Sequence, residues 1–286
     1  MISDITLGQF FPGFSPLHKL DPRTKIILAI LFIVAVFLVN NPVGFALILI
    51  FTVALVLISK ISLKVVLRGI RPIIFILIFT SIINLFMTDG AGEPLVSFWI
   101  FEIYKEGIIR AVFMSVRVII LIIGTSMFLT YTTSPISLTD GIESLLNPLK
   151  KIGVPVHLFA MMMTIALRFI PTLVEETEKI MNAQKSRGAD FSSGGLIKRA
   201  KALVPLLVPL FVSSFKRAEE LAVAMECRCY RGDKNRTKYV ELKYKPRDAV
   251  WFLFAAVVFA TVILLKILPY KFDVNNIVYD IAFYKI

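Results

Sequence analysis

RFIPTLVEETEKIMNAQKSRGADFSSGG, residues 168–195, runs on into LIKRAKALVPLLVPLFVSSFKRAEELAVAMECRCYRG, residues 196–232, and this stretch decides how the chain folds. Apolar and charged residues alternate here at helical spacing, which predicts two long helices, each with one apolar and one polar face. Each helix is expected to end in a triplet with a central arginine, Ser186-Arg187-Gly188 and Cys227-Arg228-Cys229. Membrane-length apolar segments dominate the rest of the chain. An arginine-ended helical arm on a membrane protein predicts contact with another protein in the cytoplasm.

Composition places the chain among membrane proteins. Of its 286 residues 57% are hydrophobic, and the mean hydropathy is +0.79, well above that of a soluble domain. The net charge is +12, and residues 175–247 hold 16 of the 32 basic residues beside 9 acidic ones. Such a basic region could bind nucleic acid. In a membrane protein it more simply indicates retention in the cytoplasm by the positive-inside rule, which we favour.

Five apolar segments predict membrane-spanning helices, four of them before residue 133 and one after residue 248. They are Thr24–Val39, Val43–Ile58, Pro72–Met87, Gly107–Thr130 and Ala249–Leu268. Four basic residues between the second and third segments place that loop and the N-terminus in the cytoplasm. These are Lys60, Lys64, Arg68 and Arg71.

We therefore predict an all-α polytopic membrane protein with about five transmembrane helices and a cytoplasmic domain of long amphipathic helices. The expected domains are an N-terminal membrane domain over 1–133, a cytoplasmic coupling-helix domain over 134–247, and a last span with an external tail over 248–286. The apolar run LFAMMMTIAL, residues 158–167, is too short to span alone. We expect it to pack at the inner edge of the membrane, and whether residues 156–174 enter the bilayer is left open.

The sequence contains little that points to catalysis. No P-loop, HExxH, CxxC or nucleophile-elbow pattern occurs. Cys227 and Cys229 are two apart, a spacing that points helical side chains in roughly opposite directions, so we interpret them as small packing residues without a disulfide or metal. Acidic pairs such as Glu175-Glu176 are interpreted as solvated. The predicted spans hold almost no acidic residue, which argues against proton or cation coupling and assigns any energy supply to a partner.

Three segments, in order, resemble the transmembrane T component of energy-coupling factor (ECF) transporters. They are GQFFPGFSPLHKLDPRTK (8–25), PISLTDGIESLLNPLKKIGVP (135–155) followed by LRFIPTLVEETEKIMNAQKSRG (167–188), and KRAEELAVAMECRCYRG (216–232). In that family two Ala-Arg-Gly-like triplets end the coupling helices, and each docks in a groove of one of two ABC-type ATPases. The resemblance thus implies an ATPase-docking role for Ser186, Arg187, Gly188, Cys227, Arg228 and Cys229.

This chain departs from the family pattern at the residues that flank the arginines. Ser186 replaces alanine in the first triplet, and cysteines replace both small residues in the second. Because Cys229 stands where the pattern has glycine, the way in which the second helix ends is left open. An arginine offers five donors in a planar fork, which suits carboxylates or carbonyls at the floor of a groove.

The resemblance also implies a substrate-binding S component, import of vitamins or other micronutrients, and a prokaryotic plasma membrane. It implies no cofactor on this chain, with ATP and Mg used by the partner ATPases, and no nucleic acid as partner. We expect the S component to contact seven residues of the second arm helix, around the prolines that are expected to bend it. The alternative is that these seven residues form the core between the two arm helices. They are Val204, Pro205, Leu206, Leu207, Pro209, Leu210 and Phe211.

Two other hypotheses compete with this interpretation. One is a membrane-embedded enzyme that uses Arg117, Arg168 or the basic loops on an anionic lipid-like substrate. The other is a basic membrane anchor for nucleic acid or anionic lipid. Arg117 lies inside the fourth predicted span, so it should face protein or water, as a functional group or as an anchor between helices.

Overall fold

The computed structural model describes residues 10–88, 96–98, 101–189, 191, 195–232 and 242–267. Within these residues the chain is helical apart from one short hairpin, which confirms the predicted all-α class. The predicted external tail lies outside the described residues, as do the N-terminal residues 1–9 and most of the basic connection after Gly232.

The described residues form two compact units. Residues 10–141 and 242–267 make up one unit, the bundle, and residues 142–232 make up the other, the arm. The predicted domain boundaries also assign segments to the two sides of a membrane, and they stay predictions.

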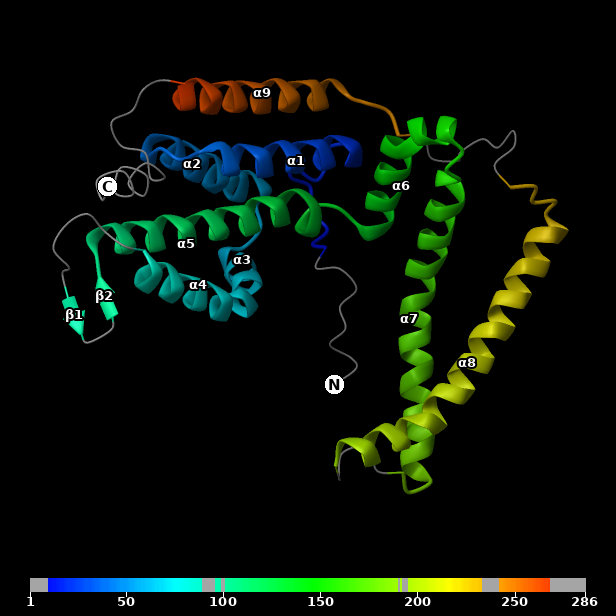
Figure 1. Cartoon of the computed structure of the whole chain (residues 1–286). Helices are drawn as coiled ribbons and strands as arrows, with labels where there is room; N and C mark the ends of the chain where they lie inside the picture. The colour runs from blue at the N-terminus through cyan, green and yellow to red at the C-terminus, as the bar shows by residue number, and fades with distance from the viewer. Residues whose placement is uncertain are drawn as a thin grey trace. The chain divides into compact units, whose positions relative to one another are not determined.

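The bundle is a stack of helices. Figure 1 shows α9, α1, α5 and α4 lying over one another in that order. Its elements are α1 (Pro22–Leu38), α2 (Pro42–Ser59), α3 (Leu63–Ile70), the 3₁₀ helix η1 (Arg71–Ile73), α4 (Ile74–Met87), α5 (Lys105–Thr125), the π-helix η2 (Ser126–Tyr131) and α9 (Pro246–Ile267). The short strands β1 (Val96–Phe98) and β2 (Phe101–Ile103) pair antiparallel between α4 and α5, a hairpin that the sequence did not predict.

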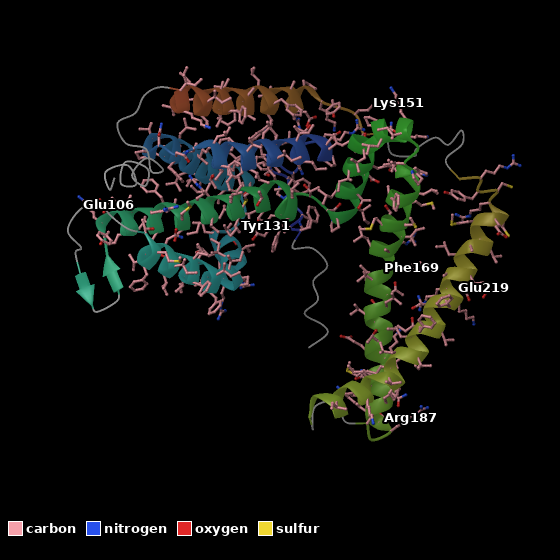
Figure 2. The ribbon with its side chains drawn as sticks, viewed as in Figure 1. Glu106, Tyr131, Lys151, Phe169, Arg187 and Glu219 are labelled. Carbon is pink, nitrogen blue, oxygen red and sulfur yellow. The ribbon has the colours of Figure 1, made fainter. Side chains whose placement is uncertain are left out.

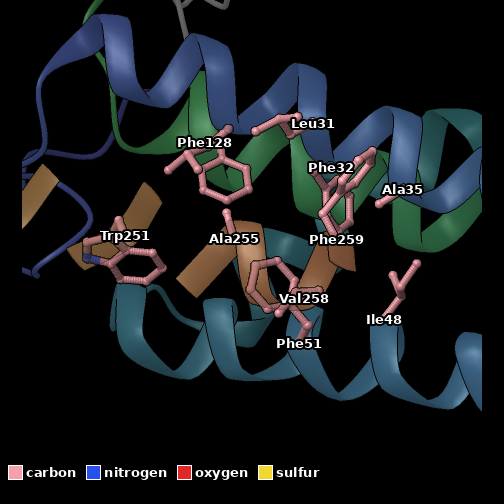
Figure 3. A pocket seen from close by; sticks show the side chains of 11 residues that line it. Leu31, Phe32, Ala35, Ile48, Phe51, Phe128, Trp251, Ala255, Val258 and Phe259 are labelled. Carbon is pink, nitrogen blue, oxygen red and sulfur yellow. The ribbon is translucent and has the colours of Figure 1, made fainter. Parts of the chain in front are cut away.

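The core of the bundle is aromatic and aliphatic. Phe32 of α1, Phe51 of α2 and Phe128 of η2 pack with ring centroids about 6 Å apart. Figure 3 shows these rings around a small apolar cavity that α9 closes with Ala255 and Val258. The packing is tight: a Cβ on the glycine at 124 of α5 would lie 2.1 Å from a Phe32 ring carbon.

Among the residues that the structure describes, five helical segments are long and apolar enough to cross a membrane. They are Pro42–Ser59, Leu63–Met87, Lys105–Thr130, Val156–Ser186 and Pro246–Ile267. The number of spans agrees with the prediction, but one of the helices differs. Helix α1, with 17 residues, is too short to be counted as a span, whereas α7 is long and apolar enough. The third segment also begins earlier than predicted, since the basic residues before Pro72 are already helical.

Buried polar side chains tie α1 to α9 at their N-terminal ends. Asp248, 2% exposed, accepts from the Asp21 backbone N–H at 2.9 Å and from the Lys245 N–H at 2.8 Å. The ammonium of Lys25, also 2% exposed, donates to the Thr132 carbonyl at 2.7 Å. Because the two helix starts lie together, α1 and α9 run in the same direction.

Two further polar side chains hold the turn between α1 and α2. Asn41 donates from its amide to the carbonyl of Leu265 near the end of α9, at 2.8 Å. Arg117 of α5 donates to the carbonyl of Val39 at 2.7 Å, and its guanidinium lies 5.1 Å from the Phe45 ring centroid. The prediction that Arg117 faces protein is confirmed, and its contacts are those of an anchor between helices.

The arm consists of two long helices and the short elements before them. Helix α6 (Pro135–Leu146), which begins in the bundle and ends in the arm, leads into the 3₁₀ helix η3 (Asn147–Ile152), which is followed by α7 (Val156–Ser186) and α8 (Leu196–Cys227). His157 at the start of α7 bonds Glu143 of α6 at 2.9 Å. Figure 1 shows α8 changing direction near its start, where Pro205 and Pro209 lie inside the helix.

Candidate docking site at the two arginine-bearing helix ends

Helix α7 ends in a left-handed turn directly after its arginine. Arg187 is the C-cap residue, with φ −87° and ψ 6°, and the next residue, Gly188, has φ +87°. The N–H of Gly188 bonds the carbonyl of Lys185 at 2.9 Å, and the N–H of Ala189 bonds that of Gln184 at 3.0 Å. These two bonds satisfy carbonyls that a helix end otherwise leaves open.

Helix α8 ends in the same way, although its sequence differs. Arg228 is the C-cap residue, with φ −91° and ψ 15°, and Cys229 takes the left-handed place with φ +54°. The N–H of Cys229 bonds the Glu226 carbonyl at 2.8 Å, and the N–H of Tyr230 bonds that of Met225 at 3.0 Å. The helix therefore ends without a glycine, at a conformational cost of about 1 kcal/mol.

All six residues of the two triplets are exposed. The interpretation of Cys227 and Cys229 as packing residues is wrong, because both are exposed free thiols. Each arginine sits at the negative end of a helix dipole, which mildly favours a cation there. An exposed helix end that presents a guanidinium fork can enter a shallow groove and bond acceptors in it.

The two arginine-bearing ends are the C-terminal ends of two different helices, α7 and α8. Helix α8 begins nine residues after Arg187 (196 − 187 = 9) and carries Arg228 at its far end. Its 32 residues correspond to a rod of at most about 48 Å. Figure 2 shows Arg187 at the free end of α7. Two such ends on different helices suit two separate binding sites.

A polar cross-link joins α7 to α8 between these ends. Arg217 donates to a carboxylate oxygen of Glu176 at 2.6 Å, and the hydroxyl of Ser213 donates to the other oxygen. Each arginine lies 11 residues beyond its side of the ion pair (187 − 176 = 11 and 228 − 217 = 11), or about 16 Å of helix. The cross-link is therefore a shared point from which both ends extend by equal lengths.

This cross-link was missed from the sequence. Glu176 was interpreted as solvated, whereas its side chain is 22% exposed and bonded to α8. A signal was present, because Ser213 and Arg217 are four residues apart and hence lie on one face of a helix. Only the packing of α7 on α8 identifies the carboxylate that they meet.

The residues predicted to contact the S component divide between core and surface. Leu206 is buried, at 5% exposure. Val204, Leu207 and Phe211 are exposed, as are Pro205 and Pro209, and Leu210 is half-buried. The exposed residues continue as Val208, Val212 and Phe215. Their spacing of three and four residues makes one apolar stripe along α8, of a kind that marks interaction surfaces.

Comparisons with known proteins show which family the chain resembles. A family model described as cobalt transport protein (CbiQ) matches residues 13–239. The energy-coupling factor transporter transmembrane protein EcfT of Clostridium kluyveri is 55% identical over 267 residues, covering 93% of this chain and 98% of its own. The EcfT proteins of Thermosediminibacter oceani and Bacillus subtilis are 52% and 50% identical, each covering 87% of this chain and 93% of its own length.

The chain belongs to the EcfT family. Membership places it among multi-pass transport proteins of the membrane, in agreement with its five candidate spans. Both arginine-bearing helix ends lie inside the region that the family model matches. Among the described residues, no group of three or more His, Cys, Asp or Glu side chains could hold a metal ion.

Proposed function

We propose that this chain is the non-catalytic coupling subunit of an ATP-driven ECF importer. Two ABC-type ATPases, which bind and hydrolyse ATP with Mg, dock on the helix ends at Ser186-Arg187-Gly188 and Cys227-Arg228-Cys229. A separate S component binds the vitamin or other micronutrient. The name of the relatives, energy-coupling factor transporter transmembrane protein, supports this assignment.

The observation that carries the proposal is the matched geometry of the two helix ends. Arg187 and Arg228 are both C-cap residues with nearly equal backbone angles, although their neighbours differ in sequence. A repeated geometry at two exposed ends suits two copies, or two homologues, of one kind of partner. Two ATPase subunits that close on ATP are such a pair.

The cross-link at Glu176 supports a mechanical role for the arm. When two docked subunits move toward each other, both helix ends are displaced. The ion pair holds α7 on α8 at equal distances from the two ends, so the helices turn about this point instead of sliding apart. Such a shear or rigid-body movement carries the displacement toward the start of α7 and α8.

The apolar stripe on α8 is the proposed contact for the S component. Its aromatic rings and branched side chains are exposed when the chain has no partner. Burial of an apolar side chain stabilises a contact by about 1.5–3 kcal/mol. Leu206 is assigned to the core between α7 and α8 instead. We further propose that the N-terminus and the arm face the cytoplasm, because basic residues follow α2 and dominate residues 175–247.

Charge reversal at both helix ends tests the proposal. Arg187→Glu combined with Arg228→Glu should abolish co-purification of the two ATPase subunits and reduce substrate uptake to background. Bidentate arginine contacts to acceptors become repulsive when the charge is inverted. Membrane insertion and thermal stability of the chain should not change, since both side chains are exposed.

A matched control reverses two exposed lysines of the same helices. Lys179→Glu with Lys216→Glu removes as much positive charge from the arm without touching either helix end. This variant should retain the ATPases and uptake. Normal uptake by the double arginine variant, or an equal loss in the lysine control, would refute docking through the helix ends.

A further inference from the structure

An open cavity lies between the segment before α1 and the turn after α2. It has a volume of about 460 Å³ and is separate from the arginine-bearing helix ends. One wall is formed by residues 11–15 with His18, and the other by residues 59–62 with Val65. Both walls belong to the bundle. Because α1 starts and α2 ends here, the cavity lies at the level where these helices meet one membrane surface.

The cavity is amphipathic. Phe11, Phe14 and Ile61 contribute apolar surface, and Phe14 is 91% exposed at its rim. Ser59, Lys60 and Ser62 contribute polar groups, all of them from the wall after α2. Among the described residues that line the cavity, none is acidic. An exposed phenyl ring and a lysine that line one cavity are a combination that suits lipid at a membrane surface.

Helix α3 extends this surface beyond the cavity. Leu63 and Leu67 are exposed, and the neighbouring Lys64 and Arg68 are exposed as well. Each pair is four residues apart, so the leucines and the cations form two adjacent rows along the helix. On its other face, Val66 is buried against Tyr131 and Met127. The helix is thus fixed to the bundle with one apolar and one basic row outward.

His18 contributes no positive charge to the cavity at neutral pH. Its Nδ1 lies 2.6 Å from the Ser15 hydroxyl, and its Nε2 lies 2.8 Å from the Phe11 carbonyl. Burial lowers the pKa of the imidazole, and Lys25 nearby lowers this pKa further, against a raising effect of the Phe11 carbonyl. The cations available to a ligand are therefore Lys60 and the basic row of α3.

We propose that this cavity is a binding site for an anionic phospholipid, with the phosphate near Lys60 and Ser62 and an acyl chain along Phe14, Leu63 and Leu67. Charge complementarity selects an anionic over a zwitterionic headgroup, because the basic groups have no acidic neighbour in the lining. The exposed apolar row selects a lipid over a free phosphate. The inference depends on membrane location and is independent of ATPase docking.

A matched pair of substitutions at Ser62 tests the site. Ser62 is the N-cap residue of α3, and aspartate and asparagine are both favourable there. Ser62→Asp and Ser62→Asn therefore preserve the helix and differ only in charge. The detergent-extracted full chain is titrated with phosphatidylglycerol, phosphatidylcholine or inorganic phosphate, and bound molecules are counted by native mass spectrometry.

The natural chain and Ser62→Asn should retain phosphatidylglycerol at least about fivefold better than phosphatidylcholine. Ser62→Asp should lose this preference, as should Lys60→Gln, which serves as the second variant if Ser62→Asp does not fold. Lys201→Gln on α8 is the control and should behave as the natural chain. Equal retention of both lipids by the natural chain, equal binding by both Ser62 variants, or competition by inorganic phosphate would overturn the proposal.

Discussion

The buried charged side chains of the bundle and the charged side chains of the arm have opposite uses. In the bundle, Lys25 and Asp248 are nearly inaccessible and each bonds backbone groups of another segment. In the arm, Arg187 and Arg228 are exposed at helix ends, and the charged cross-link at Glu176 is only partly buried. The buried charges of the bundle thus fix one packing of helices, whereas the charges of the arm remain accessible to other molecules.

The difference predicts where a substitution affects folding and where it affects function. Variants at buried positions of the bundle should reduce the yield of folded protein and, with it, every activity alike. Arm variants should leave the folded chain intact and change how it works with partners. The following variants test this separation, from the largest expected effect to the smallest.

Removal of the buried carboxylate should have the largest effect. Asp248→Ala leaves the N–H groups of Asp21 and Lys245 without their acceptor and removes one of the two carboxylates, Asp21 and Asp248, that lie near the Lys25 ammonium. Breaking such a buried ionic group costs about 3–5 kcal/mol. Thermal unfolding in detergent should show this loss, while Glu219→Ala, at an exposed carboxylate of α8, should change little. Equal stability of the two variants would contradict the assigned role of Asp248.

A small added side chain in the bundle should come next. Gly124→Ser places a Cβ 2.1 Å from the Phe32 ring, so the ring must move out of a packed core at a cost of about 1–3 kcal/mol. The same substitution in the arm, Gly195→Ser, meets no atom within 4 Å and supplies a favoured N-cap residue to α8. We expect the bundle variant to unfold at lower temperature and the arm variant to remain within about 0.5 kcal/mol of the natural chain.

Loss of the arm cross-link should reduce transport more than stability. Arg217→Ala removes a partly exposed ion pair, at a cost of about 1 kcal/mol or less, and frees α7 to slide on α8. ATPase subunits should still co-purify, but uptake for each ATP hydrolysed should fall. The reversed pair, Glu176→Arg with Arg217→Glu, should recover part of the coupling. If Arg217→Ala takes up as much substrate for each ATP hydrolysed as the natural chain, the cross-link does not transmit the movement of the arm.

The smallest expected effect compares the two helix ends directly. Cys229→Gly relieves a non-glycine residue at φ +54° and should stabilise the end of α8 by up to about 1 kcal/mol, as read by protection of its amides from hydrogen exchange. Gly188→Cys, the converse change at φ +87°, should destabilise the end of α7 by a similar amount. A loss of protection in Cys229→Gly would mean that the two ends are not equivalent.

Local rules predicted the helices well, because their signals lie within a few residues. Asp21 followed by Pro22 predicts the start of α1, and in the structure the Asp21 carboxylate accepts a hydrogen bond from the Arg23 N–H at 2.9 Å. The two arginine-bearing ends were likewise predicted from their own triplets together with the family resemblance.

What local rules missed depends on residues far apart in the chain. Burial of Lys25 requires the carbonyl of Thr132, 107 residues away, and the bonded state of Glu176 requires α8. The left-handed cysteine is a different case. Sequence rules disfavour a residue other than glycine there, and the two backbone bonds that close the end of α8 outweigh that preference.

The most direct test of the central claim uses the chain's own cysteines. Its only two, Cys227 and Cys229, flank Arg228 and are exposed in the isolated chain, and Ser186→Cys adds a thiol beside Arg187. Maleimide labelling is compared between the chain alone and the complex with its ATPase subunits. The account predicts rapid labelling at both helix ends of the free chain and strong protection of both in the complex. Equal labelling in the two states would contradict docking through these ends.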